Sequence, residues 1–223
     1  MKRALIIAAH PDDDILGCGG LMSKYRNTVF FKIVYIGEGS TCRFKNPNSK
    51  NAIKEIKIRN SYAINALSIL GIENYSFNNL PCGRFDQVPL IEINKIIENE
   101  ILEFSPDTVF THANCDSNQD HVKVHDATII ATRPGEKVKN VFSYEVLSSS
   151  EWGFKKAFNP NVFYKLSENN VDEKYESLKQ FKSETQSYPH PRSKEGIYSN
   201  AVFRGVQSGN KFAEAFELIR QLN

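Results

Sequence analysis

The amino-acid sequence predicts an α/β fold of three layers: a mainly parallel, Rossmann-like sheet with helices on both faces. Two apolar runs, at residues 3–9 and 29–39, are typical of strands buried on both faces, and each leads into a polar or glycine-rich loop. Segments with helical spacing alternate with further strands, and this alternation favours a parallel sheet. The 223 residues contain no internal repeat and no low-complexity linker, so we expect one domain spanning 1–223.

The first half of the chain predicts a strand, a helix and a second strand, followed by a long helix. After the strand at 3–9, a glycine-rich start leads into a helix-compatible segment at 17–26, and the strand at 29–39 follows. Residues 51–70 carry apolar side chains at helical spacing, and Gly71 stands where a helix C-cap is expected.

The alternation continues through the rest of the chain. Residues 74–80 predict a short strand, 90–105 an amphipathic helix, 106–112 a strand that ends in a histidine, and 121–133 a helix. The remaining predictions are strands at 140–150 and 162–167 and helices at 171–184 and 211–222.

Composition excludes several classes of protein. Lys and Arg total 28 against 26 for Asp and Glu, so the net charge of +2 and the lack of a basic run argue against nucleic-acid binding. No apolar segment approaches the roughly 20 residues of a transmembrane helix, and carboxylates follow the first apolar run where a signal peptide needs small neutral residues. The four cysteines form no CxxC pair, which favours reduced thiols in a cytoplasmic protein.

Candidate metal ligands follow two of the predicted strands. Ligands bind open parallel sheets beyond the carboxyl ends of the strands, and both 10–14 and 112–121 follow such ends. Catalytic zinc takes three ligands from His and carboxylates and keeps one open position, which two His and one Asp can supply. The residues available are His10, Asp12, Asp13, Asp14, His112, Asp116, Asp120 and His121.

Simpler interpretations compete with the metal site. An Asp-rich turn is most often solvated, but three adjacent carboxylates repel one another unless a cation is bound. The glycines at 17–20 lack the GxGxxG spacing of dinucleotide sites, and the acidic residues before them would repel a pyrophosphate. His121 and His125 have the spacing of HExxH ligands but lack the intervening Glu, so that zinc motif is rejected.

AHPDDD at 9–14 with GCGG at 17–20, and NQDH at 118–121, resemble the two signature segments of the PIG-L/LmbE-like zinc-dependent deacetylases. The resemblance runs nearly end to end. Three further segments match the family pattern: GEGST at 37–41, Arg59 with LG at 70–71, and PDTVFTH at 106–112. Three C-terminal segments resemble a bacterial branch linked to surface polysaccharides and N-acetylglucosamine derivatives: PHPRS at 189–193, RG at 204–205 and FAEAF at 212–216.

The resemblance implies a role for each matching position. His10, Asp13 and His121 correspond to the zinc ligands, with another divalent ion such as Fe²⁺ as the alternative metal. Asp12 corresponds to the general base that takes a proton from a zinc-activated water. Asp120 corresponds to a residue that orients a site histidine or a substrate group.

The chain also departs from the family pattern. Family members often carry a stabilising histidine three residues before the last ligand, where this sequence has Asn118; His112 or His125 could replace it, or the metal alone could serve. Arg59 and Arg192 are candidates for anchoring an anionic or hydroxyl-rich substrate, although surface ion pairs are a commoner use of arginine.

The function implied is removal of the N-acetyl group from an N-acetylglucosamine-type amino sugar or glycoconjugate. Two alternatives stay open: a metal-dependent esterase or other amidase, because the same metal site serves either bond, and a catalytically silent carbohydrate-binding protein, because of Asn118. The expected partner is therefore a small acetylated sugar or glycoconjugate rather than nucleic acid, and a homo-oligomer is compatible with the sequence.

Overall fold

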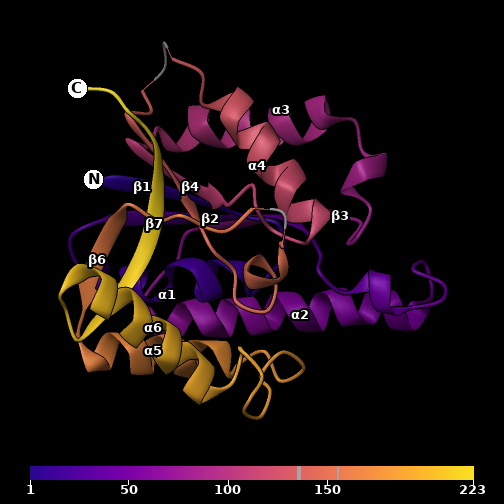
Figure 1. The fold of residues 1–223 in the computed structure, drawn as a ribbon. Coiled ribbons are helices and arrows are strands. Elements are labelled where there is room, and N and C mark those ends of the chain that lie inside the picture. Colours follow the sequence, from indigo (N-terminus) through magenta and orange to yellow (C-terminus); the bar gives the residue numbers. More distant parts are fainter. Residues whose placement is uncertain (135–136, 155) are drawn as a thin grey trace.

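The structure, a computed structural model, describes residues 1–134, 137–154 and 156–223, and a seven-stranded sheet forms its centre (Figure 1). The strands are β1 (Arg3–Ala8), β2 (Phe30–Gly37), β3 (Tyr75–Leu80), β4 (Thr108–His112), β5 (Asn140–Tyr144), β6 (Val162–Leu166) and β7 (Phe212–Gln221). The α-helices are α1 (Asp13–Tyr25), α2 (Lys50–Ile69), α3 (Leu90–Phe104), α4 (Gln119–Ala131), α5 (Glu168–Leu178) and α6 (Lys194–Ser208).

The order of the strands creates a crevice at the carboxyl ends of the central strands. The order is β3-β2-β1-β4-β5-β7-β6, with β1 to β5 parallel and β7 antiparallel to both of its neighbours. From β1 the chain builds outward through β2 and β3, and then returns to place β4 on the other side of β1. The loops after β1 and β4 therefore diverge at a topological switch point, where open α/β sheets bind their ligands.

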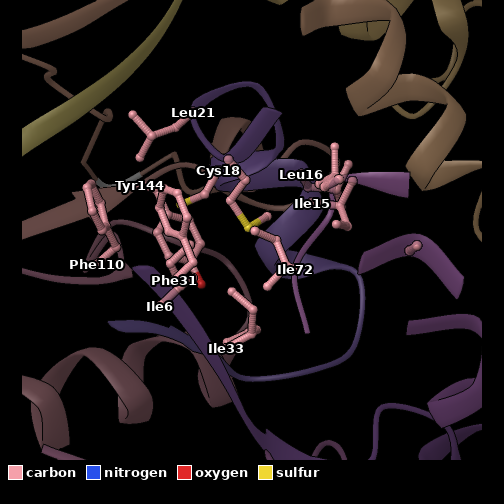
Figure 2. Packing of buried hydrophobic residues seen from close by; sticks show 14 of the residues in the cluster. Ile6, Ile15, Leu16, Cys18, Leu21, Phe31, Ile33, Ile72, Phe110 and Tyr144 are labelled. Atoms are coloured by element: carbon pink, nitrogen blue, oxygen red, sulfur yellow. The ribbon is translucent and has the colours of Figure 1, made fainter. Parts of the chain in front are cut away.

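Two layers of helices cover the sheet, as predicted. Helices α3 and α4 lie on one face, and α1, α2, α5 and α6 lie on the other (Figure 1). Successive side chains of β1 alternate between the two cores: Ile6 packs with the α1 side, whereas Leu5 and Ile7 pack with α3 and α4. Figure 2 shows Ile6 among the aromatic and aliphatic side chains of the α1 face. The predicted three-layer α/β fold is confirmed.

Helix α1 lies unusually close to the sheet because of its glycines. A Cβ atom on Gly17 would come within 2.1 Å of the Tyr144 ring, so this position excludes any side chain. The Tyr144 hydroxyl in turn donates to the Ile7 carbonyl at 2.7 Å. The glycine-rich segment thus serves packing, and it brings the first turn of α1 to the end of β1.

The prediction of a helix at 211–222 is wrong. These residues form β7, which lies between β5 and β6 and hydrogen-bonds to both. Ala, Glu and Leu favour a helix locally, but the two neighbouring strands satisfy the backbone of this segment, and that tertiary pairing outweighs propensity. Glu214 becomes buried on β7, where Lys174 compensates its charge at 2.7 Å.

Other differences concern boundaries and one missed helix. Helix α1 begins at Asp13 rather than near residue 17, β5 ends at Tyr144, and α5 ends at Leu178. Helix α6 was not predicted; it begins after Ser193, whose hydroxyl accepts from the Gly196 N–H at 2.9 Å. The remaining predicted elements agree with the structure. Across the three described ranges, every helix is too short or too polar to span a bilayer.

Candidate metal centre

The switch point between β1 and β4 gathers three buried donor groups. His10 follows β1 directly, Asp13 opens α1, and His121 lies in the first turn of α4, which follows β4. Their ligand atoms all lie within 4.8 Å of one another. Asp13 Oδ2 is 3.6 Å from His10 Nδ1 and 3.3 Å from His121 Nε2. The structure thus brings together the three residues that the sequence identified as candidate ligands.

The donor set suits a catalytic divalent ion. Two imidazole nitrogens and one carboxylate oxygen form one of the ligand combinations that zinc takes in hydrolases, with a further position left for water or substrate. All three side chains are buried, with at most 6% of any residue exposed. An ion held there would be only partly hydrated, which strengthens its electrostatic effect.

In both His10 and His121, the ring nitrogen that faces away from Asp13 lies next to a carboxylate. Asp120 Oδ2 lies 2.9 Å from His10 Nε2, and Asp116 Oδ2 lies 3.0 Å from His121 Nδ1. Each histidine therefore turns its other nitrogen toward Asp13. Carboxylates in this position fix the ring orientation and the tautomer of metal-binding histidines.

Backbone and hydroxyl groups in turn hold these two carboxylates. Asp120 accepts from the backbone N–H groups of Gly83 at 2.6 Å and Phe85 at 3.0 Å, both in the loop after β3. Asp116 accepts from the hydroxyls of Ser149 and Ser150 in the loop after β5. Loops from three strand ends thus support the two histidines.

The electrostatics of the cluster favour positive charge. Although burial lowers the pKa of His121, the carboxylates of Asp13 and Asp116 raise it to about 10. Burial raises the pKa of Asp116, but its hydrogen bond with His121, the charge on His121 and the bond from Ser149 bring it down to about 2. Without a cation the cluster therefore holds a proton on His121. A metal ion has to displace that proton, so metal binding weakens as pH falls.

Asp12 lies beside the donor set in a different environment. Its φ of 117° is rare for a residue other than glycine, and it aims the carboxylate toward two arginines. Arg59 Nη2 lies 3.0 Å from Oδ1, and Arg192 Nη1 lies 2.8 Å from Oδ2. Glu184 bridges the same arginines at 2.5 and 2.7 Å. Two carboxylates and two guanidinium groups thus form a buried network that fixes Asp12.

A cavity of about 190 Å³ opens onto these groups. Its walls carry the three donor residues, Asp12, both arginines of the network and Asn118. A second cavity of about 500 Å³ has Asp116, Ser117, Trp152 and Phe154 among its lining residues. Consecutive residues line the two cavities, Ser117 the larger and Asn118 the smaller.

The structure distinguishes Asn118, which stands at the position of the missing family histidine, from the two candidate replacements, His112 and His125. Asn118 lies in the cavity wall and also caps α4, accepting from the Asp120 N–H at 3.0 Å. His112 is fully buried behind the site: its Nε2 accepts from the Ala9 N–H at 2.8 Å, and it is outside the cavity lining. His125 Nδ1 donates to the His112 carbonyl at 2.7 Å.

The sequence analysis did not identify the roles of two acidic residues, Asp116 and Glu184. Asp116 was among the available acidic residues, but its spacing from His121 did not reveal that it holds this histidine. Glu184 gave no signal, because it lies in an irregular segment that the sequence assigned to a helix. Both act through partners distant in sequence.

A family model confirms the resemblance found in the sequence. Residues 5–132, more than half of the chain, match the model described as GlcNAc-PI de-N-acetylase (PIG-L). The chain is also similar to a protein of Escherichia coli (strain K12) described as an uncharacterized deacetylase, YaiS. The two are 29% identical over 189 residues, which cover 82% of this chain and 91% of the relative.

Solved structures share the fold over the whole chain. The N,N′-diacetylchitobiose deacetylase of Pyrococcus horikoshii superposes with a TM-score of 0.77 at 18% identity, covering 98% of this chain and 84% of that protein. The 4-carboxy-2-hydroxymuconate hydratase GalB of Pseudomonas putida KT2440 superposes with a TM-score of 0.74 at 21% identity, covering 100% and 98%. At these identities the likeness establishes the fold alone.

Proposed function

The chain belongs to the GlcNAc-PI de-N-acetylase (PIG-L) family of deacetylases, and from that premise we propose that it removes the N-acetyl group from an N-acetylglucosamine-type sugar or glycoconjugate. The observation that carries the proposal is the buried group of His10, Asp13 and His121 at the switch point, with Asp12 beside it. The name of the Pyrococcus structure, a deacetylase of an N-acetylated disaccharide, supports the same class of substrate.

We assign His10, Asp13 and His121 as the residues that hold a divalent ion, with zinc as the first choice and iron(II) as the alternative. When bound, the ion supplies a Lewis acid for an acyl oxygen and lowers the pKa of water toward about 7. Asp120 and Asp116 keep the two histidines oriented for that role, because each occupies the nitrogen that faces away from Asp13.

Asp12 is the proposed general base. It lines the cavity next to the donor set, and its backbone and its two arginine partners fix the carboxylate in one orientation. Each carboxylate oxygen keeps a second lone pair after pairing with one arginine, so Asp12 can still accept a proton. After the C–N bond breaks, the same carboxyl group can return that proton to the departing amine.

The substrate contacts are proposed from the cavity wall. Asn118, Arg59 and Arg192 line the small cavity, where the Asn118 amide and the N–H groups of Arg192 can donate to hydroxyl or acyl oxygens. For His112 the structure favours a different role from the one expected. Because it has no exposed surface and stacks on His121 with ring centroids 4.1 Å apart, we propose that it supports the metal ligand rather than the substrate.

The test is an amine-release assay on the purified protein loaded with zinc. The panel contains N-acetylglucosamine, N,N′-diacetylchitobiose, an O-acetylated sugar and an N-acetylated peptide, with metal content measured on the same samples. The proposal expects amine release from the N-acetyl sugars and little from the peptide. Release of acetate from the O-acetyl sugar alone would instead establish the esterase, and zinc-loaded protein inert toward the whole panel would contradict deacetylation.

The same panel should include a hydratase assay. The GalB structure is described as a hydratase and shares the fold, so the architecture by itself does not select the reaction. The family match and the donor set favour hydrolysis here. We also propose a cytoplasmic location, which suits the four free thiols of the chain.

A further inference from the structure

Two cysteines that are distant in sequence meet at the rim of the metal centre. Cys42 lies in a short 3-10 turn (Thr41–Arg43), and Cys82 lies in the loop after β3. Their Sγ atoms are 3.1 Å apart, and both residues line the small cavity. Cys42 is exposed to solvent, whereas Cys82 is buried. Both thiols are free, and neither has a role in the proposed deacetylation.

A single buried carboxylate holds the two cysteine loops together. Glu38, which is 2% exposed, accepts from the backbone N–H groups of Ser40 at 2.7 Å and Thr41 at 2.9 Å on one loop. It accepts from the Cys82 N–H at 2.8 Å on the other. The approach of the two sulfur atoms therefore depends on the backbone of both loops and not on one flexible side chain.

The remaining gap between the sulfur atoms is small. A disulfide bond is about 2.05 Å long, so a shift of roughly 1 Å, shared between two side chains, would close it. The Sγ contact with Cys82, together with the charge of Arg43, outweighs burial and lowers the pKa of the Cys42 thiol to about 6. The exposed sulfur thus has thiolate character at neutral pH, as a thiol that reacts with oxidants requires.

We propose that Cys42 and Cys82 form a reversible disulfide at the rim of the metal centre, in reaction with hydrogen peroxide. The Cys42 thiolate attacks one peroxide oxygen, so the O–O bond breaks, hydroxide leaves and Cys42 becomes a sulfenic acid. The Cys82 sulfur then attacks the Cys42 sulfur, and the S–O bond breaks. The departing hydroxide takes the Cys82 proton and leaves as water. Each sulfur is oxidised by one electron, and the two peroxide oxygens are reduced.

The bond has a structural consequence and a chemical one. It links residues 42 and 82 covalently, so the two loops that Glu38 joins by hydrogen bonds become fixed to each other. It also removes a competing donor, because Cys82 with His10 and Asp120 forms a second buried group whose ligand atoms lie within 4.8 Å of one another. Once oxidised, Cys82 no longer offers a thiolate, and His10 is left to the group with Asp13 and His121.

Peptide mapping of the full-length protein tests the proposal without any assay of activity. The purified protein is treated with stoichiometric hydrogen peroxide, blocked with an alkylating agent, digested and analysed by mass spectrometry. We expect a linked peptide that joins Cys42 to Cys82, the loss of two of the four titratable thiols, and full recovery with dithiothreitol. Cys42→Ser should lose both effects, whereas Cys115→Ser, a matched change of a buried cysteine outside the pair, should keep them.

The Cys82→Ser variant and the Tm of the oxidised wild type provide two further tests of the disulfide. Cys82→Ser should stop at the Cys42 sulfenic acid, which dimedone traps. In the wild type, oxidation should raise Tm by about 5 °C or more, because the bond constrains a long loop in the unfolded chain. Irreversible oxidation of Cys42 without a linked peptide, a link to another cysteine, or a lower Tm in the linked protein would overturn the proposal. None of these outcomes depends on whether the protein is a deacetylase.

Discussion

The three proposed metal ligands and the partners of Asp12, the proposed general base, come from different structural elements. The donor residues lie within 5–132, the part that matches the family model, in the loop after β1, at the start of α1 and in the first turn of α4. The partners of Asp12 come instead from helix α2 and from the irregular segment between α5 and α6, which supply Arg59, Glu184 and Arg192. The positions of the proposed ligands therefore depend on the carboxyl ends of β1 and β4. The ion pairs around Asp12 depend in addition on how the segment between α5 and α6 packs over it.

This comparison makes metal content and turnover separable. Substitutions of the donor residues or their carboxylate partners should reduce metal binding, and substitutions around Asp12 should leave the metal in place.

The largest effect is expected for His121→Ala. The substitution removes a metal ligand, so metal affinity should fall by more than the roughly 10- to 100-fold that loss of an outer partner costs, and turnover should be lost with it. Inductively coupled plasma mass spectrometry after dialysis against a weak chelator measures the retained metal. His190→Ala, which changes a histidine outside the donor group, is the control and should retain its metal. Full metal retention in His121→Ala would contradict the assignment.

Asp12→Asn should separate the two regions most clearly. It removes the proposed general base but none of the proposed ligands, so the turnover number should fall by about 10²- to 10⁴-fold while the metal content stays that of the wild type. Steady-state kinetics on the best substrate of the panel, with metal analysis of the same sample, measures both. A variant with wild-type turnover would remove Asp12 from the mechanism.

Asp116→Asn should show an intermediate effect on the metal. The amide can still meet the His121 ring, but it no longer carries the charge that favours a ligating orientation, so zinc affinity should fall about 10- to 100-fold. Competition with a chromogenic chelator gives the affinity directly. The neighbouring Ser117→Ala is a matched control that should bind zinc normally. Unchanged affinity in Asp116→Asn would mean that the serine hydroxyls alone orient this loop.

Glu184→Gln tests the other region, and its effect is on stability. Burial raises the pKa of Glu184, but Arg59 and Arg43 together with Arg192 lower it from 4.5 to about 2, which corresponds to about 3 kcal/mol of folding free energy at neutral pH. Because the pKa is lowered in the folded state, this stabilisation is complete above pH 4.5 and is lost as pH falls toward 2. Urea unfolding of the wild type and the variant should therefore differ most at pH 7 and converge in acid. A constant difference across that range would mean that the carboxylate charge contributes nothing.

Much of the fold and of the donor set could be predicted from local sequence. The apolar run of β1 and the histidine at the end of β4 fix where two strands stop, and parallel strands bring their carboxyl ends to the same edge. The histidines and carboxylates after β1 and β4 therefore converge in any sheet that places these strands side by side, and the resemblance to the family singled out His10, Asp13 and His121 among them. The long helix α2 was equally visible, since its apolar spacing and Gly71, at a φ of 69°, mark its length and its end.

Other features were invisible because nothing local encodes them. The segment of β7 has the composition of a helix, and only the gap between β5 and β6 makes it a strand. The pairing of Asp12 with Arg192 and the contact of Cys42 with Cys82 join residues 180 and 40 positions apart. Ion pairs and sulfur contacts of this kind leave no periodic pattern in the chain.

The sequence by itself thus determined the α/β class, the strand ends and the pool of histidines and carboxylates that contains the candidate metal ligands, because hydrophobic periodicity and the direction of parallel strands are set locally. The tertiary structure alone decided which carboxylates orient the histidines, what surrounds the general base, and which thiols meet. These features depend on the packing of distant loops against one another, and burial gives each contact its strength by removing the competing water.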